Sequence, residues 1–176
     1  MSAFGKRWMT MVLCLVLAGG FIASAKAPTQ TSFVGNFDDT TPSGAGSWTV
    51  RGSWSLQVLG ASGKADFNAA LTMVRSDHWV LTTGADASDP VTRNAHTHHI
   101  GVEDGLVSEI PNGFRVTGMA RVTSNGNLAF GGMVLVQVDV TGGTSVATSN
   151  VKVTFGGAAA GHFGAQPING VVSGAK

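Results

Sequence analysis

The sequence predicts an all-β fold, either an antiparallel β-sandwich or a small β-barrel of about eight to ten strands, behind an N-terminal signal peptide. Apolar and polar residues alternate along much of the chain, which is typical of strands with one buried face. Glycine is abundant, at 25 of 176 residues, and only 12% of the residues are charged. Glycine-containing turns separate the alternating segments at short intervals, and we expect no helix after the signal.

The first 25 residues have the three parts of an export signal. Lys6 and Arg7 give a cationic start, residues 9–17 are almost wholly apolar, and Ala23-Ser24-Ala25 forms a small-residue cleavage pattern. The apolar run is shorter than the roughly 20 residues of a membrane-spanning helix. We therefore expect residues 1–25 to be a cleaved signal peptide and residues 26–176 to form a single domain. The product would be a bacterial protein exported to the periplasm or the medium, with no stable membrane span after cleavage.

The composition of residues 26–176 excludes several function classes. The only cysteine, Cys14, lies in the signal, so the mature domain has no disulfide, thiolate ligand or cysteine nucleophile. The full chain has 11 basic and 10 acidic residues. Loss of Lys6 and Arg7 with the signal leaves the mature domain with fewer basic than acidic residues, so we expect no nucleic-acid partner. The sequence contains no serine-hydrolase elbow and no phosphate-binding glycine loop, which favours a protein that is not an enzyme.

The first strands are expected at residues 48–58 and 65–73. Apolar side chains occupy alternate positions in both segments, and Gly52 indicates a bend or bulge in the first one. A polar corner and a short apolar run at 75–81 predict a hairpin, and residues 84–94 predict a loop.

The middle of the chain is expected to form two further hairpins. Residues 96–103 and 106–110 flank Asp104-Gly105, a dipeptide that favours the positive φ of a two-residue hairpin turn. Pro111-Asn112-Gly113 predicts the next turn, and a one-sided strand follows at 114–122.

The last third of the chain predicts strands at 134–140, 151–155 and, as a final edge strand, 168–173. The glycine and alanine residues of segment 156–164 favour a loop over a helix. Asp38-Asp39, near the start of the domain, is interpreted as a turn.

A histidine cluster gives the one chemical hypothesis. His96 and His98 are two residues apart in a predicted strand, so their side chains share a face with Cα atoms roughly 6.5 to 7 Å apart and can converge on one ion. A Zn or Cu site needs a third ligand, for which His162 and His78 are the candidates. The next candidates are the carboxylates Asp77, Asp86 and Asp89.

The alternative interpretation is a structural one. Ile100 and Val102 continue the face of His96 and His98, so the pair could simply cap the core where it meets water. His99 points to the other face, where we expect it to be exposed. Trp48 and Trp54 share a face with aliphatic residues and are expected to pack in the core.

Three functions follow from these observations. The first is an exported binding or structural module that holds an unknown small ligand or cell-surface component through its loops. The second is a metal-binding protein or metal-dependent enzyme, with Zn or Cu bound by His96, His98 and either His162 or His78. The third is a small outer-membrane barrel.

Overall fold

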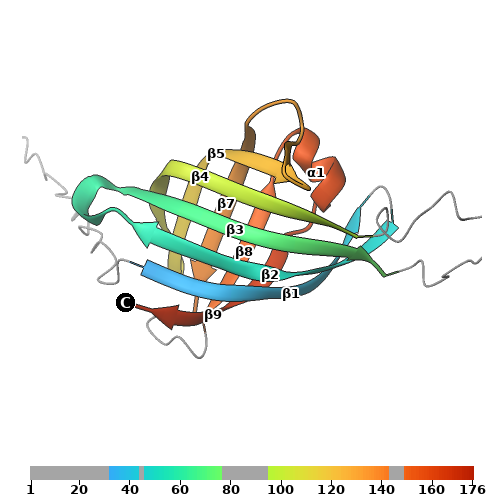
Figure 1. Ribbon diagram of the computed structural model, residues 1–176. Coiled ribbons are helices and arrows are strands. Elements are labelled where there is room, and N and C mark those ends of the chain that lie inside the picture. The colour runs from blue at the N-terminus through green and yellow to red at the C-terminus, as the bar shows by residue number, and fades with distance from the viewer. Residues whose placement is uncertain (1–31, 44–45, 77–94, 143–148) are drawn as a thin grey trace, which may run out of the picture.

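A computed structural model of the chain describes residues 32–43, 46–76, 95–142 and 149–176, which form an antiparallel β-barrel (Figure 1). The predicted signal peptide, the apolar run 78–81 and the loop 84–94 lie outside the described residues. Within the ranges that are described, no helix is long and apolar enough to cross a membrane.

The barrel is an all-antiparallel meander of eight strands that closes on itself, which decides between the two predicted architectures. Each strand pairs with the next in the order β1-β2-β3-β4-β5-β7-β8-β9, and β9 pairs with β1. The remaining strand, β6, is a two-residue partner of β5. The strands are β1 (Ser32–Ser43), β2 (Gly46–Val58), β3 (Lys64–Arg75), β4 (Ala95–Ile110), β5 (Gly113–Ser124), β6 (Asn127–Leu128), β7 (Val134–Thr141), β8 (Asn150–Phe155) and β9 (Ile168–Ala175).

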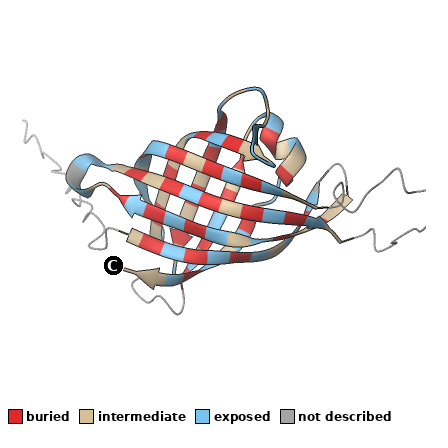
Figure 2. Ribbon diagram, in the orientation of Figure 1, coloured by how far each residue is buried: buried red, intermediate tan, exposed pale blue. Residues whose placement is uncertain are grey.

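The core fills the interior of the barrel. Buried and exposed residues alternate along each long strand, as Figure 2 shows, because successive side chains of a strand point to opposite faces. Trp48 and Trp54 are both buried in this core, as predicted from their aliphatic neighbours. The outward positions of β2 include Arg51, Ser55 and Gln57.

The first and last strands differ from their predictions. Asp38 and Asp39 lie within β1 and form no turn, and β9 is no edge strand, because it pairs with both β1 and β8. Asp39 helps to join the first and last strands of the barrel: its Oδ2 accepts hydrogen bonds from the backbone and side-chain amides of Asn169 at 2.7 and 2.8 Å. Alternation in β1 is harder to see in the sequence because Gly35 occupies one of its inward positions.

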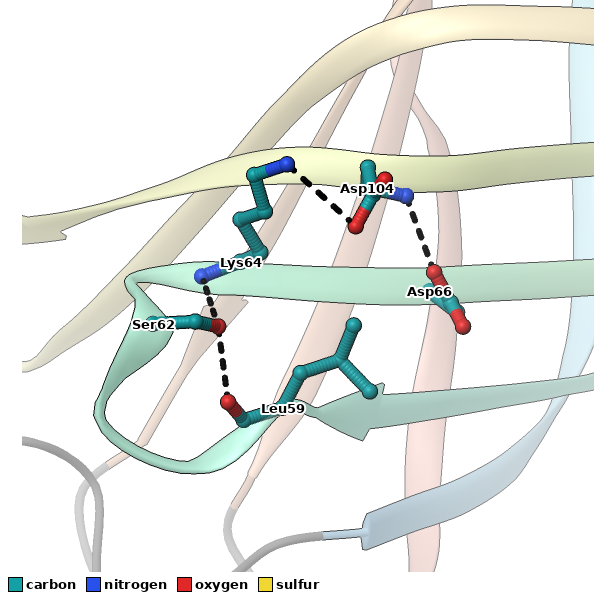
Figure 3. Close-up of polar contacts among 5 residues, drawn as sticks. All are labelled: Leu59, Ser62, Lys64, Asp66 and Asp104. Atoms are coloured by element: carbon teal, nitrogen blue, oxygen red, sulfur yellow. Dashed lines mark hydrogen bonds and ion pairs between the residues drawn. The ribbon is translucent and has the colours of Figure 1, made fainter.

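The predicted hairpin turn at Asp104-Gly105 is a bulge inside one long strand. β4 has one residue more than either neighbour between Val102 and Leu106, and Asp104 takes a positive φ of 54°. Its amide donates to the carboxylate of Asp66 at 2.9 Å, and its own carboxylate lies 3.5 Å from the ammonium of Lys64 (Figure 3). The positive-φ preference of this dipeptide was a correct signal, but bulges and hairpin turns share it.

Segment 156–164 was predicted to be a loop, and the structure corrects this with the short helix α1 (Ala158–Phe163). Alanine has the highest helix propensity, and glycines with positive φ, Gly157 and Gly164, flank the helix. A helix this short is not stable alone. It is held by burial of Ala159 and Phe163, and Phe163 stacks on Phe155 of β8 with ring centroids 4.0 Å apart.

Gly52 is a point of close approach between strands. The register with β1 and β3 is continuous across it, so it is no bulge, but a Cβ at this position would lie 2.0 Å from the backbone oxygen of Ala70. We expect Gly52→Ala to lower the free energy of unfolding by about 1 to 3 kcal/mol, because the strands must move apart. Gly101→Ala is the matched control, since its Cβ would meet only the Asn68 side chain, at 3.6 Å. Urea unfolding of both variants checks this, and equal stabilities would contradict it.

Candidate metal centre

His96 and His98 lie at the start of β4 with both rings on the inner face of the barrel wall. Their ring centroids are 4.7 Å apart. Ile100 and Val102 continue this face and are buried, whereas His99 is exposed on the outer face. The predicted facing of all five residues is therefore confirmed.

His162 comes to this pair from the last turn of α1. Figure 1 shows α1 at one end of the barrel, on the side where β4 begins. The burial of Phe163, the next residue along the chain, holds the helix against the barrel wall. His162 was one of two predicted third ligands. The other, His78, and the carboxylates Asp77, Asp86 and Asp89 lie outside the described residues.

The three imidazoles meet through their Nε2 atoms. Nε2 of His162 lies 2.9 Å from Nε2 of His98 and 3.1 Å from Nε2 of His96. One ligand nitrogen from each of the three rings lies within 4.8 Å of the others, so the three histidines are close enough to hold a metal ion. Two nitrogens bound to one tetrahedral zinc ion at 2.0 to 2.1 Å are about 3.3 Å apart. Binding would therefore need the two contacts of His162 to lengthen by only a few tenths of an ångström.

A backbone contact fixes the orientation of the most buried ring. Nδ1 of His98 donates a hydrogen bond to the carbonyl oxygen of Thr123 on β5, at 3.1 Å. In the neutral imidazole, this places the proton on Nδ1 and leaves the lone pair on Nε2. A hydrogen bond from the second ring nitrogen to a carbonyl is the usual support of a metal-bound histidine.

The two short contacts of His162 cannot both be good hydrogen bonds. A ring nitrogen carries one proton or one lone pair, directed along a single line in the ring plane. If Nε2 of His162 donates to His98, it has no lone pair to accept a hydrogen bond from His96. A cation at the centre would instead receive the lone pairs of all three nitrogens.

The surroundings favour the neutral, metal-binding form of each ring. Burial, followed by the neighbouring charges of His162 and His96, lowers the pKa of His98 to about 4. Burial lowers the pKa of His162, and burial followed by the charge of His162 lowers the pKa of His96. All three rings can therefore present lone pairs at neutral pH.

Aromatic side chains surround the cluster. Trp48 contacts His96 edge-on with ring centroids 4.9 Å apart, Phe163 contacts His98 at 4.8 Å, and Phe130 lies 5.7 Å from His162. Phe130 has a positive φ of 58°, which is rare for an aromatic residue. Sequence reasoning assigned Trp48 to the core alone and gave no role to the other two. An apolar wall of this kind excludes water and strengthens electrostatic interactions inside it.

A shallow groove of about 1370 Å³ lies along the outer faces of several strands, away from the inward-facing histidines. Small residues such as Ala70 and Gly101 line part of it, and its exposed apolar side chains include Leu106 and Met133. No cluster of three or more metal-ligating side chains falls on this groove among the residues that the structure describes. The histidine cluster is therefore the stronger candidate site.

Comparisons of the chain with protein-family models, with curated proteins and with solved structures found no match.

Proposed function

We propose that this protein binds one divalent transition-metal ion, Zn(II) or Cu(II), through the Nε2 atoms of His96, His98 and His162. The observation that carries the proposal is the convergence of these nitrogens from two elements that are 64 residues or more apart in the sequence. The hydrogen bond from Nδ1 of His98 to Thr123 supports it, because this bond aims the free lone pair at the cluster centre.

The ligand atoms set the choice of metal. An all-imidazole set suits Zn(II) and Cu(II) better than Mg(II) or Ca(II), which prefer oxygen ligands. Three histidines leave at least one coordination position for another group, as in catalytic zinc sites. We propose a metal-binding role and assign no reaction to this position.

This proposal is the second of the three functions predicted from the sequence, the metal-binding one, with His162 as the third ligand. We further propose that the module acts outside the cytoplasm, as the sequence of residues 1–25 suggests. An outer-membrane barrel carries an apolar band on its outer surface. The outward Arg51, Ser55 and Gln57 of β2, with an apolar interior, favour the metal-binding module over that alternative.

The test is the metal content of the protein purified without chelators and then dialysed against a mixture of zinc and copper salts. We expect about one equivalent of bound metal, because three imidazoles meet at one point. His99→Ala is the matched control, since it removes a neighbouring histidine whose side chain faces outward. Metal content far below one equivalent in the folded wild-type protein would reject the proposal, and a loss of metal in His99→Ala would reject the assigned ligands.

A further inference from the structure

Thr41, at the end of β1, holds the segment that carries His162. Its side chain is 1% exposed, and its hydroxyl donates a hydrogen bond of 2.8 Å to the carbonyl oxygen of Phe163. The two residues are 122 positions apart in the sequence. Across the β1–β2 pairing, Thr41 is also opposite Trp48, whose ring contacts His96. Thr41 is therefore one residue away from His162, through Phe163, and one residue away from His96, through Trp48.

The chain after His162 lies directly on Thr41 and Pro42. A Cβ at Gly164 would be 2.3 Å from the backbone oxygen of Pro42 and 2.7 Å from Oγ1 of Thr41. Gly164 also has a φ of 93°, a conformation that side chains disfavour. This contact is therefore tight and specific to glycine.

The apolar contacts of α1 do not determine how the helix is oriented on the barrel. Burial of Ala159 and Phe163 keeps the helix on the barrel, but such contacts are not directional. A six-residue helix has too few internal hydrogen bonds to define its own orientation. The hydrogen bond from Thr41 is directional, and it acts on the residue next to His162.

We propose that Thr41 is a positioning residue for the metal ligand His162, acting through its hydrogen bond to the Phe163 carbonyl and its contact with Gly164. The inference rests on the proposed metal-binding function. Thr41 does not touch the ion; it sets the place of His162 relative to His96 and His98. Outer groups that orient a ligand commonly change metal affinity about 10- to 100-fold.

The experiment measures Cu(II) affinity by competition with a chelator, in the wild-type protein and in a His162→Ala background. Thr41→Val removes the hydroxyl at nearly constant shape, and we expect it to weaken Cu(II) binding by about 10-fold or more in the wild-type protein. Thr41→Ser keeps the hydroxyl and should restore affinity to within about threefold. The matched control is Thr40→Val, an exposed neighbour, which should leave affinity unchanged.

The His162→Ala background separates positioning from general loosening. With His162 absent, the remaining binding depends on His96 and His98, so Thr41→Val should have no further effect if it acts through His162. An equal loss in both backgrounds, or no loss in either, would overturn the inference while leaving metal binding intact. If the wild-type protein binds Zn(II) but no Cu(II), the same titrations are made with Zn(II). If it binds neither metal, the proposed function fails and this inference fails with it.

A second variant covers the case in which Thr41→Val does not fold. Gly164→Ala keeps the Thr41 hydroxyl but pushes the chain away from it, because the new methyl group overlaps Pro42. We expect the same pattern, with weaker Cu(II) binding in the wild-type protein and none of that effect in the His162→Ala background. Wild-type affinity in folded Gly164→Ala would contradict the proposal.

Discussion

Replacing His162 with alanine is expected to weaken binding of Zn(II) or Cu(II) by more than about 100-fold, because loss of a ligand should exceed the 10- to 100-fold cost of losing a group that merely orients one. His162 is the ligand that lies within 3.1 Å of both other nitrogens, so its removal leaves only the His96–His98 pair. The half-buried His162 is also a better position for substitution than His98, whose removal would leave a cavity in the core.

The measurement is a chelator competition titration of the wild-type, His162→Ala, His96→Ala and His99→Ala proteins. We expect large losses of affinity for His162→Ala and His96→Ala. The affinity of His99→Ala should be unchanged, because His99 is next to His98 in the sequence but faces outward. If His162→Ala binds as tightly as the wild-type protein, the assigned ligand set is wrong.

The second large effect is a loss of stability of the metal-free protein in acid. The pKa of His98 is about 4 in the folded state against 6.5 for an unperturbed histidine, with burial as its main cause. Between these two values the unfolded chain binds more protons than the folded protein, so the free energy of unfolding falls as the pH falls. The lowered pKa values of His96 and His162 act in the same direction. We expect His98 to account for a loss of about 3 kcal/mol, complete below pH 4.

Urea unfolding of the chelator-treated protein at several pH values between 7 and 4 measures this loss. His98→Asn is the comparison, because its Nδ2 occupies the position of the histidine Nδ1 and can still donate to the Thr123 carbonyl but does not titrate. The variant should show a shallower decline with acid than the wild-type protein. Parallel pH profiles would mean that the buried imidazole of His98 does not make the expected contribution.

Much of the barrel could be predicted from the sequence, because period-two alternation directly reports one buried face. The strand at 48–58 and the inward facing of His96 and His98 are examples, and both are confirmed. The choice of a barrel over a sandwich could not be made, because closure depends on the pairing of β9 with β1, and both architectures bury alternate residues.

The predictions were wrong where one local sequence pattern is compatible with two different structures. Asp104-Gly105 has the backbone preference of both a turn and a bulge, and the pairing of β4 with β3 and β5 on both sides of it makes it a bulge. Segment 156–164 mixes the best helix former with the residue that most weakens helices, so burial of Phe163 determines the outcome. Thr41 gave no signal in the sequence, because its partner is the backbone of a residue 122 positions away.

The central claim is that three imidazoles bind one ion, and X-ray absorption spectroscopy of the zinc-loaded wild-type protein tests it most directly. The account predicts nitrogen ligands at about 2.0 to 2.1 Å, with multiple scattering from three imidazole rings per zinc ion. A spectrum that shows two imidazoles or fewer would contradict it.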